Sequence, residues 1–80
     1  MKNVTATIEW MGPTRNYHMI AARLQTETEY HSVLLYKYQD GRVKLNPAVS
    51  TGEPFFERLK SGSILELCEG PHIVAVCTIE

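Results

Sequence analysis

The sequence VLLYKYQDGRVKL, residues 33–45, decides the fold because it predicts a β-hairpin. Two apolar, aromatic-rich runs flank Asp40-Gly41, and each has the composition of a strand. Glycine adopts positive φ without steric penalty, and aspartate tolerates it better than most residues. Asp-Gly is therefore a favoured centre for a two-residue type I′ turn. Pro47 then ends the second strand, since proline donates no hydrogen bond to a sheet.

With Asp40-Gly41 as the only loop residues, the hairpin has a definite predicted register. Lys37 lies opposite Lys44, on a face that also carries Gln39 and Arg42. The other face is predicted to hold Leu34, Tyr36, Tyr38, Val43 and Leu45. Like charges in a cross-strand pair are unfavourable. The basic face is therefore either a site for an anionic group or a solvated surface. We favour the solvated surface, because exposed lysines separate easily in water.

Two further strands are predicted before the hairpin. Residues 4–10 alternate between apolar and polar side chains, which is the pattern of a half-buried strand, and Gly12-Pro13 then breaks it. Residues 17–24 are ambiguous, because Ile20 and Leu24 fit both a strand and one helical turn. We favour a strand because the polar run 26–29 suits an exposed strand end and turn.

A short helix is predicted between residues 50 and 62. Ser50 and Glu53 have capping-box spacing, and Pro54 suits a first helical turn. Gly62 fits the left-handed position just past the helix end. The apolar face of this helix consists of Phe55, Phe56 and Leu59.

Two strands complete the chain. Residues 63–68 alternate, Gly70-Pro71 turns the chain, and residues 73–79 are apolar at nearly every position. Such a continuous run predicts a central strand covered on both faces. The sequence thus indicates one α+β domain over residues 1–80, with the order ββββαββ. The expected fold is a mostly antiparallel sheet of about five to six strands with one short helix. We favour an open sheet slightly over a small open barrel.

Composition excludes several classes of protein. The apolar fraction of 44% is too high for a disordered chain, and the net charge of −1 argues against a general nucleic-acid coat. Residues 1–45 hold six basic and four acidic side chains, and residues 46–80 hold two and five. No run has the length of a signal peptide or of a membrane span, so we expect a cytoplasmic protein with no membrane partner.

Few residues are candidates for catalysis or metal binding. Cys68 and His72 are four residues apart, but the sequence has no CxxC or HxxxH pair of the kind that indicates a metal site. Glu66 and Glu69 flank Cys68 and oppose the low thiol pKa that a nucleophile needs. Across the predicted turn, Cys68 and Cys77 lie about four residues apart along the sheet, roughly 13 Å, which is too far for a disulfide. We therefore expect no metal, no cofactor and no enzymatic activity.

The remaining features favour a binding protein. Four tyrosines outnumber two phenylalanines, and tyrosine is enriched at protein interfaces. We hypothesise a small module that binds another protein as an inhibitor, adaptor or assembly subunit, such as a phage-type factor aimed at a host complex. The alternative is a small β-barrel that binds RNA, single-stranded DNA or a nucleotide through the basic hairpin face. A homodimer could form across a free sheet edge. The candidate partner-binding residues are Tyr17, Tyr30, Lys37, Arg42, Lys44, Glu53 and Glu57.

Overall fold

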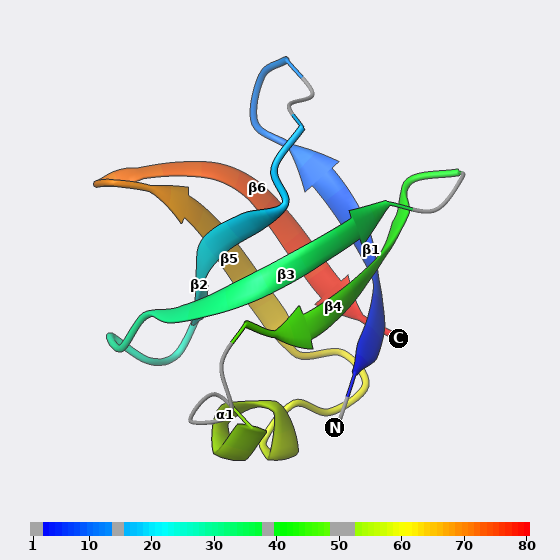
Figure 1. Cartoon of the computed structure of the whole chain (residues 1–80), viewed down its shortest axis with the longest axis vertical. Coiled ribbons are helices and arrows are strands. Elements are labelled where there is room, and N and C mark those ends of the chain that lie inside the picture. Colours follow the sequence, from blue (N-terminus) through cyan, green and yellow to red (C-terminus); the bar gives the residue numbers. More distant parts are fainter. Residues whose placement is uncertain (1–2, 14–15, 38–39, 49–52) are drawn as a thin grey trace.

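The computed structural model describes residues 3–13, 16–37, 40–48 and 53–80, which form a closed antiparallel barrel (Figure 1). Its strands are β1 (Val4–Trp10), β2 (Met19–Leu24), β3 (His31–Lys37), β4 (Arg42–Pro47), β5 (Ile64–Glu69) and β6 (His72–Ile79), and α1 (Glu53–Glu57) lies between β4 and β5. Around the barrel the strands follow the order β1-β4-β3-β2-β5-β6. The predicted order ββββαββ, the antiparallel sheet and the short helix are confirmed.

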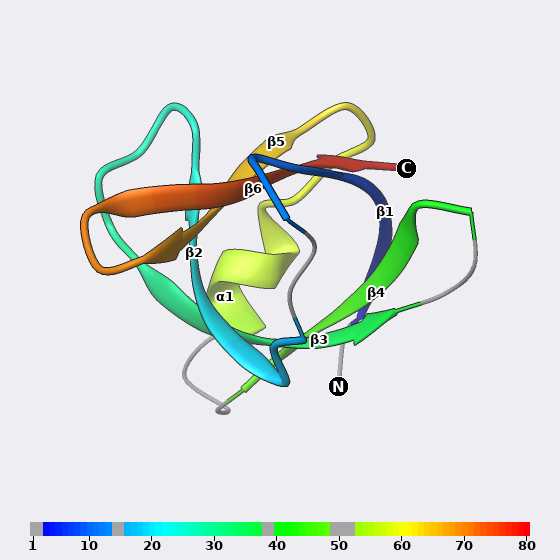
Figure 2. The ribbon, with the colours of Figure 1, turned by 90° about the horizontal axis from the view of Figure 1, so that it is seen from above.

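Closure of the sheet depends on β1, which pairs with both β4 and β6. The open sheet that the sequence slightly favoured is therefore wrong. Each strand has a neighbour on both sides, so the barrel lacks the free edge that an edge-to-edge homodimer would use. The order of the strands also places β2 and β3 on the side of the barrel opposite β1 and β6 (Figure 2).

Alternate residues of each strand point into the barrel, as the period of a strand requires. On β2 these are Ile20, Ala22 and Leu24, which are buried, so the prediction of a strand over this segment is confirmed. The core is completed by Ala6, Val33, Leu35, Val43, Leu45, Phe55, Phe56, Leu59, Leu65, Leu67, Ala75, Cys77 and Ile79. The protein thus places its buried aliphatic and aromatic side chains in one core.

The β3–β4 hairpin has a register one residue away from the predicted one. Lys37 faces Val43, and Lys44 faces Tyr36, so the two lysines lie on opposite faces of the sheet. Asp40 and Gly41 do have the positive φ values of 64° and 73° that the turn prediction required. The error arose from taking Asp40-Gly41 as the only loop residues, because a change of one residue in the loop exchanges the two faces of β3. The run Val33-Leu34-Leu35 did not reveal the error, because every residue in it is apolar and alternation does not identify the inward face.

Strand β6 also differs from its prediction. Its burial alternates, with Ala75 and Cys77 buried and Thr78 exposed, so it is not covered on both faces. A bulge between Leu67 and Cys68 shifts the β5–β6 register, so that Cys77 pairs with Leu65 rather than with Ile64. The apolar outer residues of β6 therefore face away from the core.

The helix closes one end of the barrel (Figures 1 and 2). Phe55, Phe56 and Leu59 are buried as predicted, and the Phe55 ring stacks on His31 with centroids 4.0 Å apart. Gly62 has a φ of 90°, but it follows the helix by several residues, because α1 is shorter than predicted. Ser50 lies outside the described residues.

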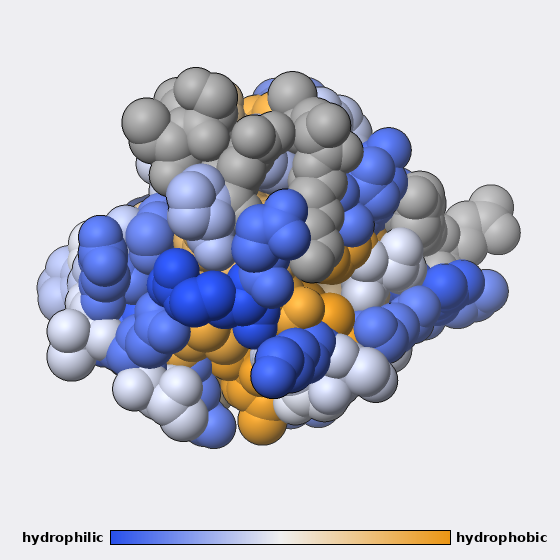
Figure 3. Space-filling model, turned by 90° about the horizontal axis from the view of Figure 1, so that it is seen from below, coloured by the Kyte–Doolittle hydropathy of each residue, from blue (hydrophilic) through white to orange (hydrophobic). Residues whose placement is uncertain are grey.

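Hydrophilic side chains surround small areas of hydrophobic surface at the helix end of the barrel (Figure 3). In the residues that the structure describes, no helix is long and apolar enough to cross a membrane.

Candidate functional site

The outer face of β2 and β3 carries a continuous group of apolar side chains. Met19 pairs with Leu34 across the two strands, Tyr36 follows Leu34 on the same face of β3, and Ala21 follows Met19 on β2. We call these four residues the apolar wall. Met19 is 58% exposed and Tyr36 is 47% exposed, which is unusual for side chains of this size.

A cation borders the apolar wall on the β4 side. Lys44 pairs with Tyr36 in the sheet register, and its Nζ lies 5.4 Å from the centroid of the tyrosine ring. Contacts of this kind are weakly attractive at exposed sites. Among the described residues, no carboxylate forms an ion pair with Lys44. An exposed aromatic ring and a positive charge therefore lie side by side.

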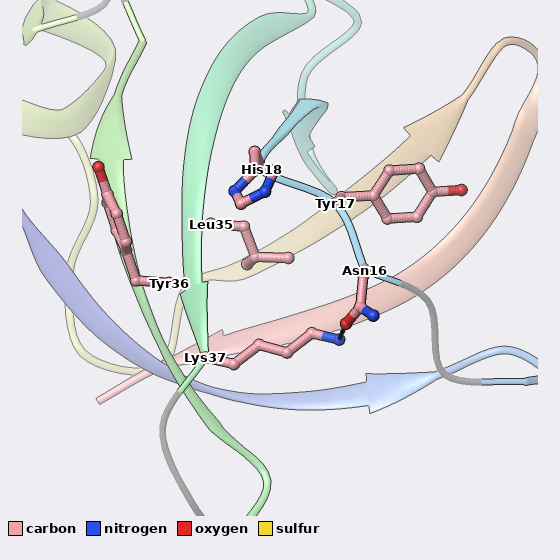
Figure 4. A pocket seen from close by; sticks show the side chains of 6 residues that line it. All are labelled: Asn16, Tyr17, His18, Leu35, Tyr36 and Lys37. Carbon is pink, nitrogen blue, oxygen red and sulfur yellow. Dashed lines mark hydrogen bonds between the residues drawn. The ribbon is translucent and has the colours of Figure 1, made fainter.

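A groove opens beside the wall, where the segment before β2 diverges from the end of β3. Its volume is about 410 Å³, and Tyr36 is one of its lining residues (Figure 4). The others are Asn16, Tyr17, His18, Leu35 and Lys37. The backbone N–H of Leu35 donates a hydrogen bond of 2.9 Å to the carbonyl of His18, which marks the last contact before the two segments separate.

Side-chain contacts fix the position of both groove segments. The Nζ of Lys37 donates a hydrogen bond of 3.0 Å to Oδ1 of Asn16 across the groove (Figure 4). It also lies 5.1 Å from the centroid of the Trp10 ring. Tyr17 stacks on Trp10 with centroids 6.3 Å apart, and its hydroxyl donates a hydrogen bond of 2.6 Å to Glu69. The groove is thus preformed at this end of the barrel.

The predicted site residues do not form one site. Tyr17 and Lys37 meet at the groove, and Lys44 borders the apolar wall. Arg42 is held on another part of the outer surface, Tyr30 lies just before β3 beside Arg23, and Glu57 is exposed at the helix end. Glu53 is the first residue of α1, and its side chain is not among those that the structure describes.

Sequence reasoning missed most of the wall. It did not select Met19 at all, and it assigned Leu34 and Tyr36 to the inward face of the hairpin. The signal that could have found them is the run Leu34-Leu35, because one of two adjacent leucines in a strand must point outward.

Two arginine–carboxylate pairs occupy other parts of the outer surface. Arg42 donates hydrogen bonds of 2.9 and 2.8 Å to the two carboxylate oxygens of Glu80, and this contact lowers the pKa of the Glu80 carboxyl. Arg23 binds Glu66, and its guanidinium lies 5.3 Å from the Tyr30 ring centroid. The hydrogen bond with Glu66 raises the pKa of Arg23. Both arginines thus have internal carboxylate partners.

The cysteines are free thiols with no sign of activation. Burial raises the pKa of Cys77 to about 12, and burial also raises the pKa of Cys68. Both thiols are therefore protonated at neutral pH. No group of three or more His, Cys, Asp or Glu side chains in the described ranges is placed to hold a metal ion.

Comparison of the chain with protein-family models, curated proteins and solved structures finds no match. Its function is therefore inferred from the geometry of the apolar wall and the groove. Together they offer exposed apolar area, one aromatic ring beside a cation, and a preformed groove with polar groups at its rim. Exposed apolar area with a polar rim is a feature that binding surfaces share.

Proposed function

We propose that this protein is a non-enzymatic module that binds another protein through the apolar wall, as an inhibitor, adaptor or assembly subunit. The observation that carries the proposal is the contiguity of Met19, Leu34 and Tyr36 on one face of β2 and β3. Single exposed apolar side chains are common on protein surfaces, but a continuous group of them marks an interaction site. Tyrosine is also a frequent anchor of binding energy at interfaces, and Tyr36 lies at the edge of this group.

The arrangement of cations favours a protein partner over a nucleic acid. The nucleic-acid hypothesis required Lys37, Arg42 and Lys44 on one face of the hairpin. Lys37 and Lys44 instead lie on opposite faces, and the Arg42 guanidinium is engaged by both carboxylate oxygens of Glu80. A backbone-tracking groove needs several cations in line. The support for the alternative is thus reduced to scattered single charges.

The experiment is affinity capture from a nuclease-treated lysate at about 0.15 M salt, read by quantitative mass spectrometry. Three forms of the full chain are immobilised: the unchanged protein, Leu34→Glu and Thr7→Glu. Leu34 lies in the apolar wall, whereas Thr7 is an exposed residue of β1 on the opposite side of the barrel. Both substitutions introduce the same charge, so Thr7→Glu is the matched control.

We expect a defined set of proteins to be enriched by the unchanged chain and by Thr7→Glu, and to fall at least tenfold with Leu34→Glu. A buried carboxylate in an apolar interface has a large desolvation penalty, which explains the expected loss. Equal capture by all three forms would contradict the assignment of the wall. Capture that disappears on nuclease treatment would favour the nucleic-acid alternative. Unfolding curves of the three proteins exclude a loss of fold as the cause.

A further inference from the structure

We propose that the binding surface continues past the apolar wall to Tyr30, and that the partner segment is apolar along its length with one carboxylate, at the end that meets Tyr36. This inference rests on the proposed function, and it adds the extent of the interface and the chemistry of the partner segment. Tyr30 and Tyr36 are 48% and 47% exposed, so each offers a ring to a partner. They are the two ends of the proposed surface.

Tyr30 lies on the same outer side of the barrel as the apolar wall. Arg23 is an outward residue of β2, since both of its neighbours in the strand are buried. The Arg23 guanidinium lies 5.3 Å from the centroid of the Tyr30 ring, which places this ring over the outer side of β2. On β3, Ser32 separates Tyr30 from the wall, and it pairs with Ala21. Because serine and alanine are small, a partner can contact the wall and the Tyr30 ring together.

The register of β2 and β3 gives the length of this surface. Tyr36 lies two positions beyond the pair of Met19 and Leu34, and Arg23 lies four positions on the other side of it, so six positions separate them. At about 3.3 Å per residue, the surface is roughly 20 Å long. A partner segment of about six extended residues or about thirteen helical residues covers that length.

The two ends of the surface differ in charge. At the Tyr30 end, Arg23 is bound by Glu66, and Glu29 precedes Tyr30 in the sequence. At the Tyr36 end, the ammonium group of Lys44 lies 5.4 Å from the centroid of the tyrosine ring, and no ion pair joins it to a carboxylate of the described residues. The Tyr36 end is therefore the more positive of the two.

The remaining charges around the Tyr36 end are balanced within the protein. Lys37 and the carboxylate of Glu69 are both at the groove and carry opposite charges, and both have contacts within the protein. On β4, Arg42 forms an ion pair with Glu80. The charge that a partner meets at this end is therefore that of Lys44.

A partner segment fits this charge distribution in one orientation. A carboxylate near Tyr36 lies beside the Lys44 ammonium group, whereas a carboxylate near Tyr30 is repelled by Glu66 and Glu29. Ion pairs at the exposed rim of an interface are weak. The apolar contacts therefore supply most of the affinity, and the ion pair with Lys44 sets the direction of the segment.

The test does not require the partner to be known. A phage-displayed library of random peptides of about fourteen residues, which span about 20 Å as a helix, is selected against the immobilised full chain and separately against Lys44→Gln. We expect the unchanged protein to enrich peptides with several large apolar residues and one aspartate or glutamate near one end. Lys44→Gln should enrich apolar peptides without the acidic residue. Failure to enrich any peptide, or enrichment of basic peptides, would overturn the proposal.

One enriched peptide is then synthesised, and its affinity is measured by calorimetry for the unchanged protein and three variants. We expect Tyr30→Ser to bind it about tenfold more weakly and Lys44→Gln about fivefold more weakly. Lys60→Gln is the matched control, because it removes the same charge from an exposed residue that follows α1 at the helix end, and its affinity should not change. Unchanged affinity for Tyr30→Ser would confine the site to the apolar wall and contradict the extension.

A peptide in which the acidic residue is replaced by its amide tests the direction of the segment. It should bind the unchanged protein about fivefold more weakly, and Lys44→Gln should bind the two peptides equally. Additive losses from the two changes would mean that the carboxylate does not meet Lys44. Equal urea denaturation midpoints of the four proteins exclude a loss of fold as the cause of weak binding.

Failure of this inference is distinguishable from failure of the proposed function. If capture of partner proteins depends on Leu34 while no peptide depends on Tyr30 or Lys44, the apolar wall is an interface without the extension or the polarity. If the peptides depend on Tyr30 and Lys44 but capture is indifferent to Leu34→Glu, the surface binds peptides and the wall is not the interface with the captured proteins.

Discussion

Two sides of the same barrel differ in the side chains that they expose. On β2 and β3 the outward positions form the apolar wall, with Met19 and Tyr36 prominently exposed. On β1 and β6 the outward positions include Thr5, Thr7 and Thr78, which we call the threonine wall, and beside them the half-buried Val76 lies opposite Glu9. Thr7 and Thr78 are neighbours in the register of these strands. Threonine suits a solvated strand surface, because its branched side chain favours the strand and its hydroxyl is hydrated.

The difference separates outward side chains that the barrel fold explains from outward side chains that it does not explain. Both sides place alternate residues in the core, so the barrel itself does not require one outer side to be apolar. Beside the threonine wall, Arg42 forms an ion pair with Glu80. Lys44 lies between the two walls, because it is opposite Thr5 on one side and Tyr36 on the other, and its ammonium group contacts the tyrosine ring. The exposed Met19 and Tyr36 are therefore the feature of the outer surface that the fold does not explain.

The largest expected effect tests whether the apolar wall truly faces outward. Leu35 is 4% exposed, and Leu34 is its half-buried neighbour on the opposite face of β3. We expect Leu35→Ala to reduce the free energy of unfolding by about 2–5 kcal/mol, and Leu34→Ala to reduce it by no more than about 1 kcal/mol. Urea denaturation of the two variants measures both values. The reverse order would restore the register that the sequence predicted and would place Leu34 and Tyr36 in the core.

Most of the fold was predictable from the sequence, because each element carries a local signal. The alternation of residues 4–10, the Asp40-Gly41 turn and the apolar face with Phe55 and Leu59 each identified an element. Closure of the sheet was not predictable, because it depends on the pairing of β1 with β4 and β6, which are far from β1 in the sequence. No local pattern encodes those pairings.

The candidate site was predicted only in part, since Tyr17, Lys37 and Lys44 were selected but the wall between them was not. The predicted inward face of β3 depends on the length of the loop that joins β3 to β4. A shift of one residue in that loop exchanges the two faces of the strand. A run of three apolar residues cannot reveal such a shift. The outward face of β3 was therefore not predictable from the sequence, because the register of the hairpin was not predictable.

The two thiols give the next effect, because both are buried but they lie on opposite faces of the sheet. Cys77 points into the barrel opposite Leu65, whereas Cys68 pairs with Ala21 of the apolar wall. Burial raises the pKa of Cys77 from 9.0 to about 12, so an unfolded chain releases this proton at a lower pH than the folded chain. Stability is thus highest below pH 9 and falls as pH rises from 9 toward 12, by at most about 1.4 kcal/mol per pH unit for one group.

Urea denaturation between pH 8 and pH 10, in steps of roughly half a pH unit, measures how the free energy of unfolding changes with pH. The Cys77→Ala variant is expected to lose this component of the pH dependence. Cys68→Ala, the matched variant, should lose less of it, because Arg23 opposes the effect of burial on the Cys68 thiol. Identical pH dependence in both variants would indicate that Arg23 does not offset the effect of burial on the Cys68 thiol.

The smallest effect concerns the ion pair beside the threonine wall. Arg42 lowers the pKa of Glu80 below its ordinary 4.5, so the pair contributes stability above that pH and loses it as pH falls through the folded-state value. Glu80→Gln should therefore be slightly less stable at pH 6, and its stability should change less between pH 6 and pH 3. Because the side chains of Arg42 and Glu80 are 50% and 36% exposed, about 0.5 M salt should remove most of the difference.

A double-mutant cycle with Arg42→Gln decides whether this small effect belongs to the pair. If it does, the double variant is no less stable than either single variant, and all three share the same weak acid dependence. Additive losses would mean that Arg42 and Glu80 act separately and that their contact adds nothing to stability. That result would weaken the contrast between the two sides of the barrel, because the ion pair would then not be a stabilising feature of the threonine wall. A coupled pair instead shows that the charge of Arg42, which lies opposite Thr7 in the sheet, is used within the fold.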